Sequence, residues 1–340
     1  MHTRYFSVFS GVGGFELGIE RAYGGVVNRH KTSANQQESR EMVQGDDVHS
    51  DKQLLQGTPT CVGFSEIDKH ASAVLKRKFP NVPNHGDITK IDWSLVPDFD
   101  LLVGGSPCQD LSVAGKRAGL EGGRSGLFYE YVRCLKEKKP SCFIWENVKG
   151  VLSSNNGRDF GAVLSALAEE GYSLWWQVLN AKDFGVPQNR ERVFVVGTRT
   201  DPRHSGEVFF DTSQTSRDPG ILKTKYGRHQ QDVFHDIDGI LQCLQVGAHA
   251  QHSHLTKIDD KRLENKVPLG LRIRRLTPRE CERLMSWPDD WTKFGDYGDG
   301  ELKEISDSQR YKMCGNGVVS TVVTHVVKEL ILHEPLPQPS

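Results

Sequence analysis

Short apolar runs alternate with amphipathic stretches over the first 200 residues of the chain. Apolar runs bounded by turn residues predict buried strands at residues 5–9, 60–64, 99–103, 141–145, 173–179 and 192–196. Helical spacing of apolar positions marks residues 15–20, 127–135 and 160–167. Strands that alternate with helices predict an α/β fold, with a mostly parallel sheet and helices on both faces.

The alternation stops in two places. Residues 25–59 form a polar insertion without periodicity, which we interpret as a surface insertion, with a DNA or partner contact as the alternative. From about residue 200 to residue 271 the sequence is polar and irregular, which indicates a second, smaller domain. Order returns at Thr277, which can cap a helix that begins with Pro278, and a last helix is expected over residues 318–332.

Composition narrows the class of protein. The length of 340 residues suggests roughly two domains, and 36% apolar residues suffice for a buried core. We expect a cytoplasmic protein, because the chain has no run of about 18 apolar residues and no apolar signal segment at its start. The seven cysteines lack Cys-x-x-Cys spacing, which argues against both a disulfide framework and a metal site and fits a reducing compartment.

Because the net charge is −1, any nucleic-acid-binding surface must be a local cluster of basic residues. One local basic patch exists, since residues 257–279 hold eight basic residues against three acidic ones. The alternative interpretation of this patch is a solvated loop.

Two motifs carry candidate chemistry. Pro107 fixes the backbone before Cys108, directly after an apolar run that predicts a buried strand, so the cysteine is displayed where it can attack. Glu146 follows the next predicted strand and is expected at the same carboxyl edge of the sheet, where such folds bind ligands. The pair combines a nucleophile with an acid.

A glycine turn follows the first predicted strand. Its pattern, Phe9-x-Gly11-x-Gly13-Gly14, resembles both dinucleotide and S-adenosylmethionine loops. Glu66 ends the second predicted strand, where a ribose-binding acid is expected.

Pro107-Cys108-Gln109 followed by Glu146-Asn147-Val148 resembles the cytosine-5 DNA methyltransferase family. The resemblance covers nearly the whole chain, because the family's other motifs appear in order: Phe9 to Gly14, Glu66, Gly86-Asp87-Ile88, Gln188 to Val193, Arg275 to Cys281, and Gly315 to Val319. Gly317 departs from the family, which prefers serine or alanine there. The resemblance thereby implies an S-adenosylmethionine-dependent methyltransferase (Rossmann-like) fold. Such a fold has a mixed, mostly parallel sheet and a second, smaller target-recognition domain.

The resemblance also implies domains and roles. The last helix packs back onto the first domain, so we expect a discontinuous catalytic domain of residues 1–199 and 305–340, with recognition domain and hinge at 200–304. Catalytic residues would be Cys108, Glu146, Arg190 and Arg192. S-adenosylmethionine, which leaves as S-adenosylhomocysteine, would contact Phe9, Gly11, Gly13, Gly14, Glu66, Asp87, Ile88, Pro107, Leu127 and Asn316. Expected DNA contacts are Ser112, Lys116, Arg117, Lys261, Arg262, Lys266 and Arg275.

The implied activity is methylation of carbon 5 of a flipped-out cytosine in double-stranded DNA, by a monomer, in a restriction–modification system. Three alternatives stay open. A transfer-RNA cytosine methyltransferase shares the motifs but carries Cys-Phe-Thr, which this chain lacks. A catalytically silent DNA-binding regulator would not need Cys108, Glu146 and Arg192, and a nicotinamide oxidoreductase would rest on the glycine turn alone.

Overall fold

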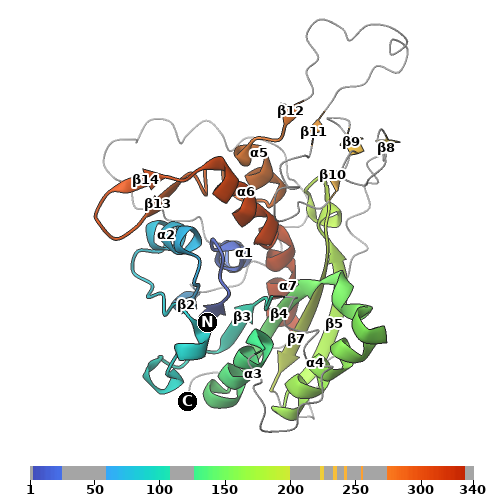
Figure 1. The fold of residues 1–340 in the computed structure, drawn as a ribbon. Coiled ribbons are helices and arrows are strands. Elements are labelled where there is room, and N and C mark those ends of the chain that lie inside the picture. The colour runs from blue at the N-terminus through green and yellow to red at the C-terminus, as the bar shows by residue number, and fades with distance from the viewer. Residues whose placement is uncertain are drawn as a thin grey trace, which may run out of the picture.

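The computed structural model describes residues 3–24, 59–107, 126–199 and 274–333, together with four short strands between residues 223 and 255. Six strands form one sheet in the order β2-β1-β3-β4-β7-β5 (Figure 1). β7 runs antiparallel to both of its neighbours, and the other pairs are parallel, so the expected mixed, mostly parallel sheet is confirmed. The strands are β1 (Arg4–Val8), β2 (Thr60–Ser65), β3 (Leu101–Gly104), β4 (Cys142–Val148), β5 (Ser173–Asn180) and β7 (Glu191–Thr198).

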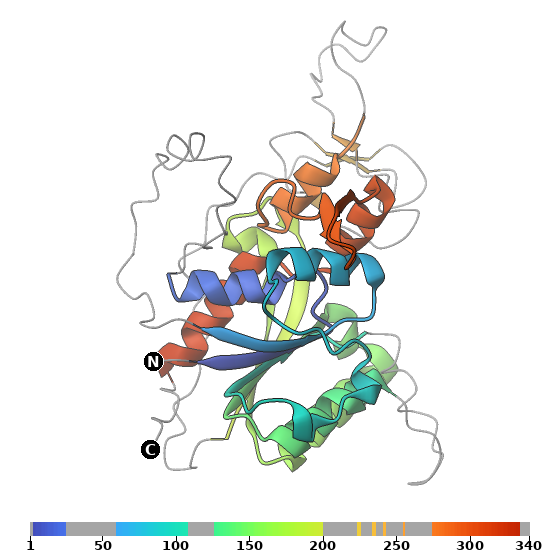
Figure 2. The same cartoon turned by 90° about the vertical axis from the view of Figure 1, so that its left-hand side faces the viewer.

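Helices cover both faces of this sheet (Figure 2). α1 (Gly14–Ala22), α2 (Lys69–Lys78) and α7 (Ser320–His333) share one hydrophobic core, and α3 (Leu127–Lys138) and α4 (Arg158–Glu169) share the other. In α4 the buried Phe160, Val163 and Leu167 recur every three or four residues, which places them on one stripe facing the sheet.

The last helix closes against the first. A Cβ atom on Gly18 of α1 would lie 2.6 Å from Val323 of α7, so only glycine permits this approach. The Ser320 hydroxyl donates a hydrogen bond to the Gly14 carbonyl at 2.9 Å, which fixes the start of α7 on the start of α1. The two ends of the chain thus build one layer.

The return segment, which we define as residues 276–304, packs into the same layer. It begins with α5 (Pro278–Leu284), whose start carries the expected threonine cap and proline, completed as a capping box by Glu280. Met285 and Trp287 are buried in the core with α1 and α7. The sequence grouped these residues with the recognition domain and hinge. Their apolar side chains pack in the same core as α1 and α7.

The hairpin of β13 (Phe294–Asp296) and β14 (Leu302–Glu304) ends the return segment, and α6 (Asp307–Asn316) leads to α7. The remaining short strands are β6 (Gln188–Asn189), β8 (Lys223–Lys225), β9 (Val233–His235), β10 (Leu241–Gln242), β11 (His254–Leu255) and β12 (Arg274–Arg275). Short 3-10 turns cover Ile88–Lys90, Trp93–Leu95, Lys149–Leu152, Ser154–Gly157 and Ala181–Phe184.

Within the described ranges, no helix is long and apolar enough to span a bilayer. The same ranges contain no cluster of three or more His, Cys, Asp or Glu side chains that could hold a metal ion. Residues 25–58 of the polar insertion lie outside the described part of the chain.

Candidate active site

A cavity of about 700 Å³ lies at the carboxyl ends of β1 to β4, the edge where open α/β sheets bind ligands. Residues from far apart in the sequence meet there. Those that the sequence placed in the site and that line the cavity are Phe9, Gly11, Glu66, Asp87, Ile88, Pro107, Leu127, Glu146, Arg192 and Asn316.

One end of the cavity is built from the glycine turn and Glu66. The Gly11 amide donates to Glu66 Oε2 at 2.8 Å, and the Asp68 amide donates to Oε1 at 2.7 Å. Phe9 and Gly11 both have positive φ, 53° and 56°, a conformation that turns the chain sharply after β1. Burial raises the pKa of Glu66, against the lowering effect of these amides.

Gly13 and Gly14 belong to the turn but do not line the cavity. A Cβ on Gly13 would lie 2.7 Å from the Phe79 ring beside α2, and one on Gly14 would lie 2.9 Å from Val318. Both positions therefore also have a packing reason to be glycine, because neighbouring apolar side chains occupy the space of a Cβ atom. Gly11 differs, since a Cβ there would meet no atom within 4 Å.

Asp87 and Ile88 lie beside this end of the cavity. The Asp87 carboxylate accepts hydrogen bonds from the Thr89 hydroxyl at 2.8 Å and the Thr89 amide at 3.1 Å. These bonds, the hydroxyl first, lower the pKa of Asp87. Ile88 is buried, so its contribution is an apolar wall.

Glu146 and Arg192 meet at the other end. Arg192 Nε lies 3.1 Å from Glu146 Oε1, and each side chain is 15% exposed. The register explains the meeting: Arg192 of β7 lies opposite Val148, two residues beyond Glu146 on β4, so both side chains are on the same face as diagonal neighbours. Burial raises the pKa of Glu146, and the charge of Arg192 opposes that rise only in part.

The backbone before Cys108 is held against Glu146. The Asn147 side chain donates to the Ser106 carbonyl at 3.0 Å, and the Trp145 indole donates to the Ser106 hydroxyl at 3.1 Å. A Cβ on Gly105 would lie 2.5 Å from Glu146 Oε2, so the loop can pass the carboxyl group only with glycine. The segment that carries the nucleophile is thereby fixed up to Pro107.

Arg190 does not line the cavity, although the sequence placed it beside Arg192. It is buried, and its guanidinium donates to the carbonyls of Gly315 and Gly317 at 2.9 and 2.6 Å. Those carbonyls flank Asn316, a cavity residue. Arg190 thus supports the segment that carries Asn316, because its guanidinium binds the carbonyls on either side of that residue.

Several expected residues lie outside the described part of the chain: Cys108, Ser112, Lys116, Arg117, Lys261, Arg262 and Lys266. Arg275 lies in β12, which pairs with β11, but its side chain is also outside the described part.

Sequence reasoning missed one pair of cavity residues. Asp68 and Lys312 both line the cavity, and Lys312 Nζ donates to Asp68 Oδ2 at 2.7 Å. Asp68 also caps α2 by accepting the amides of His70 and Ala71. The cap could be predicted from an aspartate before a helical stretch. The pairing with Lys312 could not, because that residue lies near the other end of the sequence.

Comparison with known proteins identifies the family of this chain. The family model described as C-5 cytosine-specific DNA methylase matches residues 3–240 and 223–332. The type II methyltransferase M1.ScrFI of Lactococcus lactis subsp. cremoris is 35% identical over 297 residues, which are 79% of this chain and 71% of the relative. The type II methyltransferase M.Bsp6I of Bacillus sp. (strain RFL6) is 31% identical over 350 residues, 95% of this chain and 97% of the relative.

Among solved structures, the S. pombe Dnmt2 methyltransferase superposes with a TM-score of 0.65 at 17% identity, covering 98% of this chain and 99% of its own. At that identity the likeness concerns the fold alone. The sequence matches favour the methyltransferase prediction over a nicotinamide oxidoreductase. Because the family model covers almost every described residue, including both ends of the cavity, this chain belongs to the C-5 cytosine-specific DNA methylase family.

Proposed function

We propose that the protein transfers the methyl group of S-adenosylmethionine to carbon 5 of a cytosine flipped out of a specific double-stranded DNA sequence, through a covalent adduct with Cys108. The observation that carries the proposal is the meeting of Glu146 and Arg192 beside Pro107, in the same cavity as Glu66. An acid, a cation and the residue before a nucleophile converge there, as methyl transfer to a base requires.

The residues present fit S-adenosylmethionine, which when bound supplies an electrophilic methyl group. The volume of about 700 Å³ falls within the range of small-molecule sites. Each Glu66 oxygen accepts a backbone amide, and a carboxylate has about four acceptor positions, so acceptor capacity remains for a ribose hydroxyl. Ile88 and Leu127 would face the adenine from apolar walls, and the open space at Gly11 leaves room beside the turn.

Cys108, Glu146 and Arg192 have separate roles in the reaction. Carbon 5 of cytosine is a poor nucleophile until a covalent partner adds at carbon 6. The Cys108 thiolate adds there, and the displaced ring electrons move toward carbon 5 and nitrogen 3. The Glu146 carboxyl, whose pKa is raised by burial, shares its proton with nitrogen 3, while Arg192 holds the carbonyl oxygen of the base. After carbon 5 has gained the methyl group, it loses its proton to water. Nitrogen 3 returns the shared proton to Glu146, and elimination of the thiolate restores the ring.

Target recognition belongs, in this proposal, to residues 200–273, which include the first part of the basic patch. Flipping the base costs a few kcal/mol, which contacts to the distorted strand offset. The type II methyltransferase relatives support a role as the modification enzyme of a restriction–modification system.

The decisive experiment traps the adduct. Mapping 5-methylcytosine in DNA from cells that express the protein identifies the target, and an oligonucleotide of that sequence is made with 5-fluorocytosine at the methylated position. Because fluorine blocks the final elimination, wild-type protein and S-adenosylmethionine should give a complex that survives denaturation. Cys108→Ser should bind the DNA but give no such complex, since a hydroxyl is a far weaker nucleophile than a thiolate. Absence of the complex with wild-type protein would refute the mechanism.

A further inference from the structure

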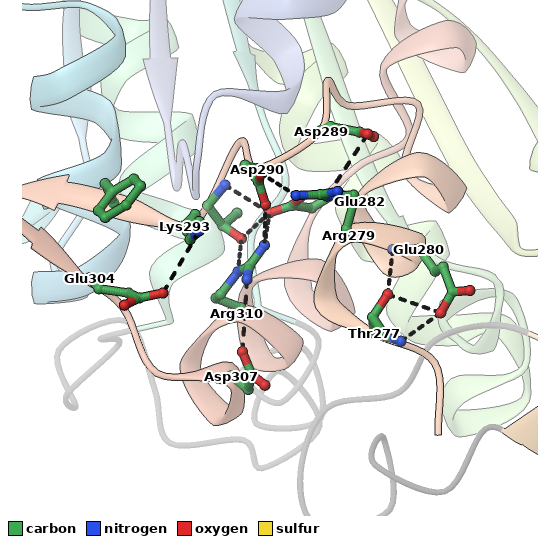
Figure 3. Close-up of polar contacts among 12 residues, drawn as sticks. Thr277, Arg279, Glu280, Glu282, Asp289, Asp290, Lys293, Glu304, Asp307 and Arg310 are labelled. Atoms are coloured by element: carbon green, nitrogen blue, oxygen red, sulfur yellow. Dashed lines mark hydrogen bonds and ion pairs between the residues drawn. The ribbon is translucent and has the colours of Figure 1, made fainter. Parts of the chain in front are cut away.

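A buried ion pair outside the cavity joins α5 to α6 (Figure 3). Glu282 is fully buried, and the Arg310 side chain is 7% exposed. Arg310 donates to Glu282 Oε1 at 3.0 Å and, through Nε, to the Thr292 hydroxyl at 3.2 Å. The Thr292 amide donates to the same Glu282 oxygen at 2.8 Å, so α5, the loop after it and α6 are held at one point.

The loop between α5 and β13, which carries Thr292, contains two residues with positive φ. Ser286 and Asp290 have φ of 57° and 56°, a region that non-glycine residues rarely adopt. Asp290 is held by Arg279 at 2.6 Å and by Arg310 at 3.5 Å. Such strain persists only where the surrounding contacts over-determine the backbone, and it is common beside functional sites.

The network lies directly behind two walls of the cavity. Met313 lines the cavity one turn beyond Arg310 on α6, and Asn316 follows at the end of that helix. In the same loop as Thr292, the Trp291 indole donates to the carbonyl of Val12, another lining residue, at 2.8 Å. A shift at the ion pair would therefore move the α6 wall and the glycine turn relative to each other.

We propose that Glu282 and Arg310 are positioning residues for methyl-donor binding: they set the position of α6 so that Met313 and Asn316 complete the cavity. The inference rests on the proposed function of that cavity. Stability alone does not require the pair, because apolar residues of similar volume often replace a buried ion pair without loss of stability. What apolar residues do not supply is the directional bonding that fixes three segments at one point.

The first test is Arg310→Lys, measured by calorimetric titration with S-adenosylhomocysteine. Lysine keeps the positive charge but cannot reach Glu282 and Thr292 with the same fork of donors. We expect a folded variant that binds S-adenosylhomocysteine about 10- to 100-fold more weakly, because α6 is displaced. The kcat at saturating methyl donor should stay close to that of wild type. The control is Arg283→Met, which removes an exposed α5 arginine paired with Asp289 at 2.6 Å and should bind as wild type does.

The double variant Glu282→Leu with Arg310→Met separates positioning from stability. We expect thermal unfolding close to that of wild type together with the weakened binding. Unchanged affinity in the folded variants would overturn the positioning role, as would a double variant that regains stability and affinity together. If wild-type protein itself failed to bind S-adenosylhomocysteine, the proposed function of the cavity would be refuted instead.

Discussion

At the scale of single residues, burial decides what Glu146 can do. Its carboxyl lies beside Arg192, whose charge favours the ionised form, yet burial raises the pKa of Glu146 on balance. A raised pKa favours the protonated carboxyl, which can act as an acid. Gly105 contributes by letting the loop before Cys108 pass against this carboxyl group.

We therefore expect Glu146→Gln to lower kcat by roughly 10²-fold or more, because the amide cannot give up a proton. Binding of S-adenosylhomocysteine should be retained. Wild-type kcat should fall as the pH rises through the raised pKa, and the variant should lose this dependence. Tritium transfer into DNA over a series of pH values measures both effects. The control is Glu191→Gln, a partly exposed carboxyl paired with Lys149. Near-normal turnover would remove Glu146 from the acid role.

Glu16 is a second buried carboxyl, on α1 and away from the cavity lining. Burial raises its pKa from 4.5 to about 7. A group whose folded pKa is raised contributes stability at low pH and loses it as the pH rises toward that pKa. The shift from 4.5 to about 7 corresponds to about 3 kcal/mol.

Glu16→Gln should therefore be the more stable protein at pH 8, by up to about 3 kcal/mol, and differ little from wild type at pH 4.5. Urea unfolding at the two pH values measures the difference. Glu169→Gln, on the exposed end of α4, is the matched control and should show no such pH dependence. A Glu16→Gln variant whose stability tracks that of wild type across this range would show that the carboxyl titrates normally.

At the scale of elements, the contact between α1 and α7 depends on one missing side chain. Gly18→Ala places a Cβ 2.6 Å from Val323 and 2.8 Å from the Ser320 carbonyl, so the helices must separate. Overpacking of this kind should cost about 1–3 kcal/mol in the free energy of unfolding.

Gly161→Ala in α4 is the matched comparison, because a Cβ there meets no atom within 4 Å and the position is exposed. This change should stabilise the protein by roughly 0.5–1 kcal/mol through helix propensity alone. Chemical denaturation of both variants checks the pair. Similar effects of the same sign would mean that α1 and α7 do not approach as closely as described.

At the scale of the whole molecule, chemistry and target recognition should be separable. Neutralising Lys261, Arg262 and Lys266 together should weaken binding to all DNA alike and reduce the slope of log K against log salt by about 0.9 per lost phosphate contact. Methylation specificity should instead change on substitution of Gln242, Gln245, His249 and Gln251, whose side chains can pair with base edges.

Grafting residues 200–273 into a relative should transfer the target sequence, as read by mapping 5-methylcytosine. The graft ends before residue 276, because the return segment from there on packs with the sheet. An active chimera that keeps its original specificity would refute this assignment.

The sequence by itself predicted the six strands of the sheet, the helices α1, α3, α4, α5 and α7, and residues at both ends of the cavity. Buried strands read as apolar runs, and motifs that follow parallel strands must meet at one edge, which is why Glu66, Pro107 and Glu146 were found together. Only the tertiary structure decided that Gly13 packs on Phe79, that Arg190 holds the carbonyls beside Asn316, and that Met285 and Trp287 join the core. The physical reason is separation along the sequence. Periodicity and turn residues depend on neighbours within a few residues, whereas these contacts join distant segments that meet only when the helices have packed.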